Sequence, residues 1–263
     1  MHDLAFVLAG FAVGFVVGLT GVGGGSLMTP LLIFFFGIKP HMAIGTDLLF
    51  AAFTKLGGSV KLARQRAIDW PVVMQLAAGS VPASLATLYV LGRTGPADPA
   101  VQHAMTTTLG AALLLTAVAT FYKAVAGKSA PRAIAPEALR HATRPRHWAL
   151  PVAFGAVIGA LVTLTSVGAG AIGVLALMLL YPALPLPRIV AADIAHAVPL
   201  TLVAGFGHAS IGTVEWPLLA KLLIGSLPGI WLGAHLVHRT SDRVIRSLLS
   251  VLLAYAGSKL ITL

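Results

Sequence analysis

The sequence predicts an all-α polytopic membrane protein made of two inverted repeats of five segments each. Of its 263 residues, 57% are hydrophobic and 10% are charged, whereas soluble domains carry about 25% charged residues. A water-soluble domain of this composition would expose too much apolar surface to stay in solution, so lipid must be the solvent for much of the chain. Motifs of the first half return in order in the second half, and Lys and Arg gather in alternate loops. These two observations predict the repeat and its inversion.

Asp47 lies in an apolar stretch and is matched by Asp193 in another. Three longer motifs recur around these acids. The pairs are Thr20-Gly21-Val22-Gly23-Gly24-Gly25 with Thr165-Ser166-Val167-Gly168-Ala169-Gly170, Ile68-Asp69-Trp70-Pro71 with Val214-Glu215-Trp216-Pro217, and Gly79-Ser80-Val81-Pro82 with Gly225-Ser226-Leu227-Pro228. We therefore divide the chain into a first transmembrane repeat at 1–126, a cytoplasmic linker at 127–148 and a second repeat at 149–263.

Each repeat contains five apolar segments. In chain order they are 4–20, 27–36, 42–62, 70–92 and 101–124, then 149–166, 171–181, 189–211, 216–238 and 245–262. Most have the roughly 20 residues that a helix needs to cross the hydrocarbon layer. Trp70 and Trp216 open equivalent segments, where Trp is typical of the membrane interface, and the Pro that follows each fits a first helical turn.

Segments 27–36 and 171–181 are too short to cross, because at about 1.5 Å per residue each helix would be only about 15 Å long. Both directly follow a Gly-rich stretch at the same place in their repeat. Paired short, Gly-interrupted segments indicate a binding site between the repeats. The sequence leaves open whether 4–20 with 27–36, and 149–166 with 171–181, cross fully or form re-entrant hairpins.

The loop charges predict which end of the molecule faces the cytoplasm. Numbering the loops alternately, one face collects Lys61, Arg64, Arg66, Lys123, Lys128, Arg132, Arg140, Arg144, Arg146, Arg188, Arg239, Arg243 and Arg246, and the other collects Lys39, Arg93 and Lys259. The first face is predicted to be cytoplasmic, and both termini to lie outside. Five segments per repeat is an odd number, so the second repeat must be inverted relative to the first.

Several classes of function are excluded by what the sequence lacks. The formal charge of +10 is scattered over short loops rather than gathered on a basic face, so we expect no nucleic-acid partner. Cysteine is absent, and no His, Asp and Glu cluster has metal-ligand spacing, so we expect neither a metal nor a cofactor. The sequence has no catalytic constellation or phosphate-binding loop, which argues against an enzyme.

The Gly-rich stretches are the first candidate binding elements. Glycine lets backbone N–H groups approach a ligand, and the start of a helix favours an anion. The candidate substrate-binding residues here are Thr20, Gly21, Gly23, Gly24, Gly25 and Ser26 in the first repeat, and Thr165, Ser166, Gly168 and Gly170 in the second. Close helix packing through small residues is the alternative explanation.

Ionisable residues within apolar segments are the second group of candidates. Asp47 and Asp193 could carry a proton, or each could cap the start of its helix. Lys55 lies two helical turns after Asp47 and could bind an anionic substrate, pair with an acid, or reach toward the cytoplasm. His196 follows Asp193 by one turn. It could relay a proton or be a hydrogen-bonded interior histidine.

These motifs resemble those of the TauE/SafE family of sulfite and organosulfonate exporters over essentially the whole chain. The similar residues are Gly18-Leu19-Thr20-Gly21-Val22-Gly23-Gly24-Gly25-Ser26-Leu27, Ala43-Ile44-Gly45-Thr46-Asp47, Asp69-Trp70 and Gly79-Ser80-Val81-Pro82. The resemblance implies a bacterial inner-membrane transporter that exports a small sulfur-containing anion such as sulfite or sulfoacetate. It assigns the substrate site to Thr20 to Ser26, Asp47 and Lys55. The second repeat departs from it, with fewer glycines and with Thr201 in place of Lys55.

Two other functions remain compatible with the sequence. One is a proton-coupled importer of another small organic or inorganic anion, with protons on Asp47 or Asp193. The other is an anion channel. The expected partners are a small anionic substrate and the lipid bilayer, and a homodimer is compatible with the sequence.

Overall fold

The computed structural model describes residues 2–20, 25–125, 149–168, 170–236 and 242–262. Within these ranges the chain forms ten α-helices and no strands. The helices are α1 (His2–Thr20), α2 (Gly25–Phe36), α3 (Pro40–Arg64), α4 (Trp70–Thr94), α5 (Pro99–Val125), α7 (Ala149–Thr165), α8 (Ala171–Leu180), α9 (Leu186–Ser210), α10 (Trp216–Leu236) and α11 (Asp242–Ile261). The all-α prediction is confirmed, and the predicted linker at 127–148 lies outside the described residues.

Helix length and composition agree with a membrane location. In the part of the chain that the structure describes, four helices are long and apolar enough to cross a membrane: α4, α9, α10 and the Pro99–Tyr122 part of α5. The predicted short segments are short here too, since α2 has 12 residues and α8 has 10. Trp70 and Trp216 begin equivalent helices and are about half exposed, as interfacial anchors would be.

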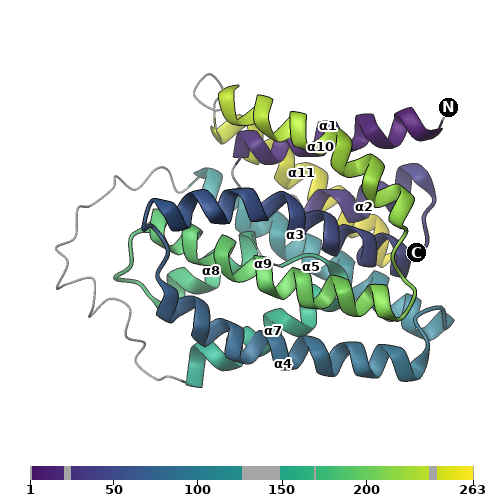
Figure 1. Cartoon of the computed structure of the whole chain (residues 1–263), viewed down its shortest axis with the longest axis horizontal. Helices are drawn as coiled ribbons and strands as arrows, with labels where there is room; N and C mark the ends of the chain where they lie inside the picture. Colours follow the sequence, from purple (N-terminus) through teal and green to yellow (C-terminus); the bar gives the residue numbers. More distant parts are fainter. Residues whose placement is uncertain (1, 21–24, 126–148, 169, 237–241, 263) are drawn as a thin grey trace.

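Two close helix pairs each combine one helix of the first repeat with one helix of the second. Helix α1 packs along α10, and α7 packs along α4; in Figure 1 these pairs form the upper and lower edges, with α3 and α9 between them. Glycines allow the α1–α10 pair to approach at backbone distance. Gly10, Gly14 and Gly18 face the backbone of α10, while Gly225, Gly229 and Gly233 face that of α1.

Helices α3 and α9 are equivalent in the two repeats and cross at the centre of the molecule. Gly45, near the start of α3, lies against Thr213, which follows the end of α9. At the opposite end, Arg188 in the first turn of α9 forms an ion pair of 3.0 Å with Asp69, just after α3. The two helices are therefore antiparallel. Antiparallel equivalents are what an inversion would produce, although the inverted duplication itself stays a prediction.

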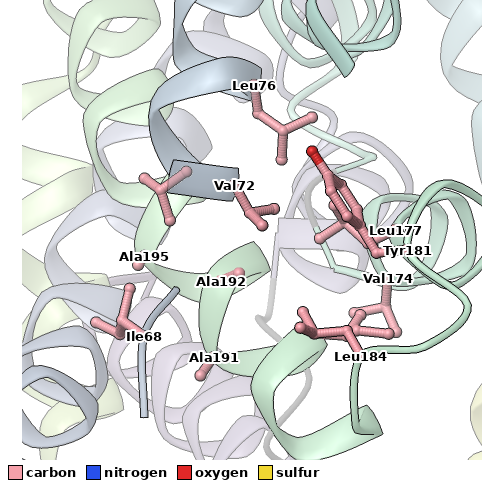
Figure 2. Close-up of a cluster of buried hydrophobic side chains, with 12 residues drawn as sticks. Ile68, Val72, Leu76, Val174, Leu177, Tyr181, Leu184, Ala191, Ala192 and Ala195 are labelled. Atoms are coloured by element: carbon pink, nitrogen blue, oxygen red, sulfur yellow. The ribbon is translucent and has the colours of Figure 1, made fainter. Parts of the chain in front are cut away.

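An apolar cluster fills the space between α4, α8 and α9 near the Asp69 end. It includes Val72, Leu76, Leu177, Tyr181 and Ala192, all at most 1% exposed, and Figure 2 shows α4 and α8 closing over the small residues of α9. The hydroxyl of Tyr181 donates a hydrogen bond of 2.6 Å to Oε1 of Gln75. The cluster includes Ala192 and Ala195, close to Asp193 in the sequence, so it adjoins the central polar residues described below.

Both chain ends lie at one end of the molecule, next to the turn between α2 and α3 (Figure 1). The connection between α3 and α4 lies at the other end. Placing both termini on one side agrees with the loop-charge argument. Which side faces the cytoplasm stays a prediction.

Candidate functional site

Asp47 is the centre of a buried polar cluster between the two repeats. It lies well inside α3, which begins at Pro40, so it is not a helix N-cap. The residue is 0% exposed. The Thr29 hydroxyl, on the short helix α2, donates a hydrogen bond of 2.5 Å to its Oδ2. The first repeat therefore joins its acid to its own short helix.

Ser166 of the second repeat approaches the same carboxylate. It follows the end of α7 with a φ of 59°, a left-handed conformation that is uncommon for residues other than glycine. Its hydroxyl interacts with Asp47 without reaching hydrogen-bond geometry. Among the described residues, neither Oδ1 of Asp47 nor Oγ of Ser166 has a hydrogen-bond partner, and both are buried. The second Gly-rich stretch thus meets the acid of the first repeat.

Lys55 joins the acids of both repeats. It is only 6% exposed, so its ammonium group stays inside the molecule rather than reaching the surface. It interacts electrostatically with Asp193 and Asp47. A buried lysine held by opposite charges avoids most of the cost of an isolated buried charge.

Asp193 occupies a position in α9 similar to that of Asp47 in α3. It lies well inside α9, which begins at Leu186, and is 3% exposed. Its Oδ1 lies so close to Cα of Gly173, in the first turn of α8, that a side chain there would collide with it. Each acid therefore contacts the short helix of its own repeat. Neither acid serves as an N-cap, the structural alternative considered above.

His196 connects the second repeat to α4 of the first. Its Nε2 lies 2.8 Å from Oγ of Ser80, and both residues are buried. Ser80 belongs to the repeated Gly-Ser-x-Pro motif, two residues before the Pro inside α4. His196 is also within electrostatic reach of Lys55. The imidazole is therefore part of the central cluster.

The other predicted site residues divide into four groups. The Thr165 hydroxyl is used locally, since it donates to the carbonyl of Leu161 and accepts from N–H of Val167. Gly168 and Gly170 have φ values of 130° and 138°, which favour glycine. Thr20 ends α1, and Gly25 and Ser26 begin α2. The predicted residues outside the described ranges are Gly21, Gly23 and Gly24.

Three residues of the cluster were not predicted as site residues: Thr29, Ser80 and Gly173. Thr29 lies one turn after the first Gly-rich stretch, and Ser80 lies in a repeated motif, so both had a weak signal in the sequence. Gly173 had none, because its role depends on a contact with Asp193. In the described ranges, no group of three or more His, Asp and Glu residues is placed to hold a metal.

A second buried polar network closes the opposite end, where α9 finishes. Nε2 of His208 donates to the carbonyl of Thr163 at 2.9 Å, and its Nδ1 lies 2.8 Å from Oγ1 of Thr213. The backbone N–H of Glu215 donates to Oγ1 of Thr46 at 3.0 Å. The His208 hydrogen bonds lie within the second repeat, and the Glu215–Thr46 hydrogen bond connects the two repeats on this side. Apolar contacts and the Asp69–Arg188 ion pair connect them on the other side.

The fold is that of a polytopic α-helical membrane protein with buried charged residues between two helical halves. Comparison with known proteins gives the family. The model of the family described as "Sulfite exporter TauE/SafE" matches residues 6–260. The chain belongs to this family. No solved structure matches the chain.

Two proteins of Bacillus subtilis (strain 168) are among its relatives. The probable membrane transporter protein YjnA is 36% identical over 273 residues, which cover 98% of this chain and 100% of the relative. The probable membrane transporter protein YunE is 26% identical over 275 residues, covering 99% and 98%. The chain is therefore similar to membrane transporters along its whole length.

Proposed function

We propose that this protein is a secondary transporter that exports a small sulfur-containing anion, such as sulfite or a C2–C3 organosulfonate, across the bacterial inner membrane. The observation that carries the proposal is the buried cluster of Asp47, Lys55, Ser166, Asp193 and His196, to which both repeats contribute. Charged residues at membrane depth are costly and mark ion and substrate pathways. The ammonium of Lys55 and the nearby hydroxyls supply groups that bind sulfonate oxygens.

The contacts between the two repeats support transport by alternating access. The cluster lies between α3 and α9, with an apolar cluster and an ion pair toward one end and the Glu215–Thr46 hydrogen bond toward the other. Rocking of one helical half against the other would open these closures in turn.

The membrane potential can supply the direction of transport. Moving one negative charge out of a negative interior releases about 2.3 kcal/mol per 100 mV. A net negative charge therefore leaves the cell without ATP.

Proton-coupled import of another small anion is a second candidate. It is favoured by one observation, the presence of carboxylates from both repeats around Lys55. The two candidates are distinguished by measuring the direction and rate of anion flux, first under an imposed membrane potential and then under an imposed pH gradient.

The test uses purified protein in proteoliposomes loaded with sulfite, sulfoacetate, isethionate, taurine or sulfate, with release followed by mass spectrometry. Lys55→Ala and Thr20→Ala should each reduce release of the transported anion at least tenfold. Lys221→Ala is the control, because Lys221 pairs with Asp3 in an exposed position of α10. Wild-type release rates in both site variants would refute the proposal, as would the absence of release for every sulfur-containing anion.

A further inference from the structure

The central cluster contains more negative than positive charge. Asp47 and Asp193 are 0% and 3% exposed, and Lys55, at 6%, is the ammonium that interacts with both. With every group ionised, these three residues carry a net charge of minus one. Among the described residues, the other polar neighbours are the hydroxyls of Thr29, Ser80 and Ser166, which carry no charge, and the imidazole of His196. Buried charges must be balanced to avoid a large desolvation cost.

An anion entering this cluster would make the imbalance larger. It would have to compete with both carboxylates for the ammonium of Lys55, in an environment with little water to screen the repulsion. We propose that the anion binds together with a proton, which is taken up by one of the two carboxylates that interact with Lys55, Asp47 or Asp193, and crosses with the substrate. This inference rests on the proposed function and specifies its coupling ion.

The geometry points to Oδ1 of Asp47 as the proton's position. Oδ2 already accepts a hydrogen bond from Thr29. Oδ1 has no partner among the described residues, and neither has the adjacent Oγ of Ser166. A carboxylic acid carries one O–H donor, so a proton on Oδ1 gives the Ser166 hydroxyl a donor to accept from. The proton would thus complete a contact between the two repeats.

The titratable groups around Asp47 come from two helices. On α3, Lys55 interacts with Asp47, and on α9 Asp193 and His196 both interact with Lys55. The described parts of α2 and the α7–α8 connection contribute the hydroxyls of Thr29 and Ser166 instead. His196 is therefore the competing site for the proton, and the test must separate it from the carboxylates.

Coupling to one proton changes how substrates of different charge respond to the membrane potential. A monoanion that moves with one proton carries no net charge, whereas a dianion that moves with one proton still carries one negative charge. The potential therefore still favours export of a dianion. It would not act on a monoanion.

The experiment measures anion and proton release from the same proteoliposomes, using isethionate as the monoanion and sulfoacetate as the dianion. Anion release is followed by mass spectrometry and proton movement by an enclosed pH-sensitive dye. Wild-type protein should move one proton per anion in both cases. An inside-negative potential should accelerate sulfoacetate release and leave isethionate release unchanged. Where a single proton is coupled, the apparent affinity should also weaken about tenfold per pH unit above the titration of the site.

Three variants locate the proton. Asp47→Asn should exchange labelled anion across the membrane while losing proton movement and the pH dependence of affinity. His196→Gln should keep one proton per anion even at a reduced rate. Glu215→Gln is the matched control, an exposed acid outside the cluster. If Asp47→Asn does not fold, as judged by gel filtration, the wild-type proton count and its response to potential decide the matter.

Two results would overturn the proposal in distinguishable ways. Anion release with no accompanying proton in wild-type protein would refute the coupling and leave the proposed function intact. Loss of proton movement in His196→Gln, together with its retention in Asp47→Asn, would refute the assignment to the carboxylates. The absence of release for every sulfur-containing anion would refute the proposed function, and the coupling with it.

Discussion

At the scale of single residues, the site depends on a few buried groups whose partners lie far away in the sequence. Asp47 accepts from Thr29, Asp193 lies against Gly173, and His196 pairs with Ser80. Removing one member of a buried pair leaves the other without a partner, which costs more than the hydrogen bond itself contributes. These contacts can therefore be tested by substitutions that preserve side-chain shape.

Thr29→Val should destabilise the protein by about 1–3 kcal/mol, because it removes the donor to Oδ2 of Asp47 and leaves a buried carboxylate without a hydrogen bond. Denaturant unfolding in detergent measures the change. Thr116→Val is the matched control, since the Thr116 hydroxyl donates only to the carbonyl of Ala112 in its own helix. Equal effects of the two substitutions would contradict the role given to Thr29.

Gly173→Ala should disturb the substrate site more than the fold. A Cβ at this position would collide with Oδ1 of Asp193, and the acid can move away only by leaving its place beside α8. We expect at least a tenfold loss of transport in proteoliposomes. Gly57→Ala is the control, because a Cβ there meets no atom within 4 Å. Normal transport by Gly173→Ala would show that the position of Asp193 is unimportant.

The Asp69–Arg188 ion pair should make stability depend on pH. Burial raises the pKa of Asp69 above its usual value, and the guanidinium of Arg188 opposes part of that rise. A raised pKa means that the folded state keeps its proton to higher pH, so stability falls as pH rises from about 4 through the raised pKa. Arg188→Gln raises the pKa of Asp69 further and should increase that fall.

The difference between Arg188→Gln and wild type should vanish below pH about 4, where Asp69 is protonated in both folded and unfolded states. At neutral pH it should reach up to about 1 kcal/mol, because Arg188 is partly exposed. Thermal unfolding in detergent across this pH range measures it, with Arg64→Gln, an exposed arginine, as the control. A difference independent of pH would rule out the charge interaction as its cause.

At the scale of helices, the molecule is held together by helix pairs whose two members come from different repeats. Helix α1 pairs with α10 and α7 pairs with α4, so no repeat can pack its first helix without the other. Small residues allow this, because lipid-embedded helices gain stability from close van der Waals contact rather than from hydrophobic burial. The glycines of α1, α7 and α10 are spaced four apart, on one face of each helix.

Gly14→Ala should destabilise the α1–α10 pair, because a Cβ would overlap the backbone of Ser226 and overpacking costs about 1–3 kcal/mol. Gly57→Ala should be neutral or stabilising by up to about 1 kcal/mol, since alanine is the better helix former where space is open. The two substitutions are therefore expected to shift the unfolding temperature in opposite directions. A stabilising Gly14→Ala would contradict the close approach.

At the scale of the whole molecule, the loop charges and the shared end of the two termini define an orientation that can be measured. The chain has no cysteine, so single cysteines can be labelled without background. Ala97→Cys, between α4 and α5, should react with a membrane-impermeant maleimide in intact cells, whereas Gln65→Cys, between α3 and α4, should react only after the membrane is opened. Both positions are exposed. The reverse pattern would place the termini in the cytoplasm.

The sequence by itself determined the order and approximate limits of the helices that the structure describes. Apolar length, glycine and proline positions and loop charge are local properties, and local properties are enough to locate helices in lipid. The same reasoning placed Asp47, Lys55, Asp193 and His196 among the candidate residues, because ionisable groups inside apolar segments are rare enough to stand out.

Only the tertiary structure decided which of these residues meet. That Ser166 faces the acid of the other repeat, that Lys55 lies between two carboxylates, and that Ser80 pairs with His196 all follow from packing between the two halves. A sequence pattern shows that a residue will be buried, but it does not specify its neighbour across a helix interface. The balance of charge in the central cluster therefore depends on the packing of α3 against α9, which the sequence does not specify.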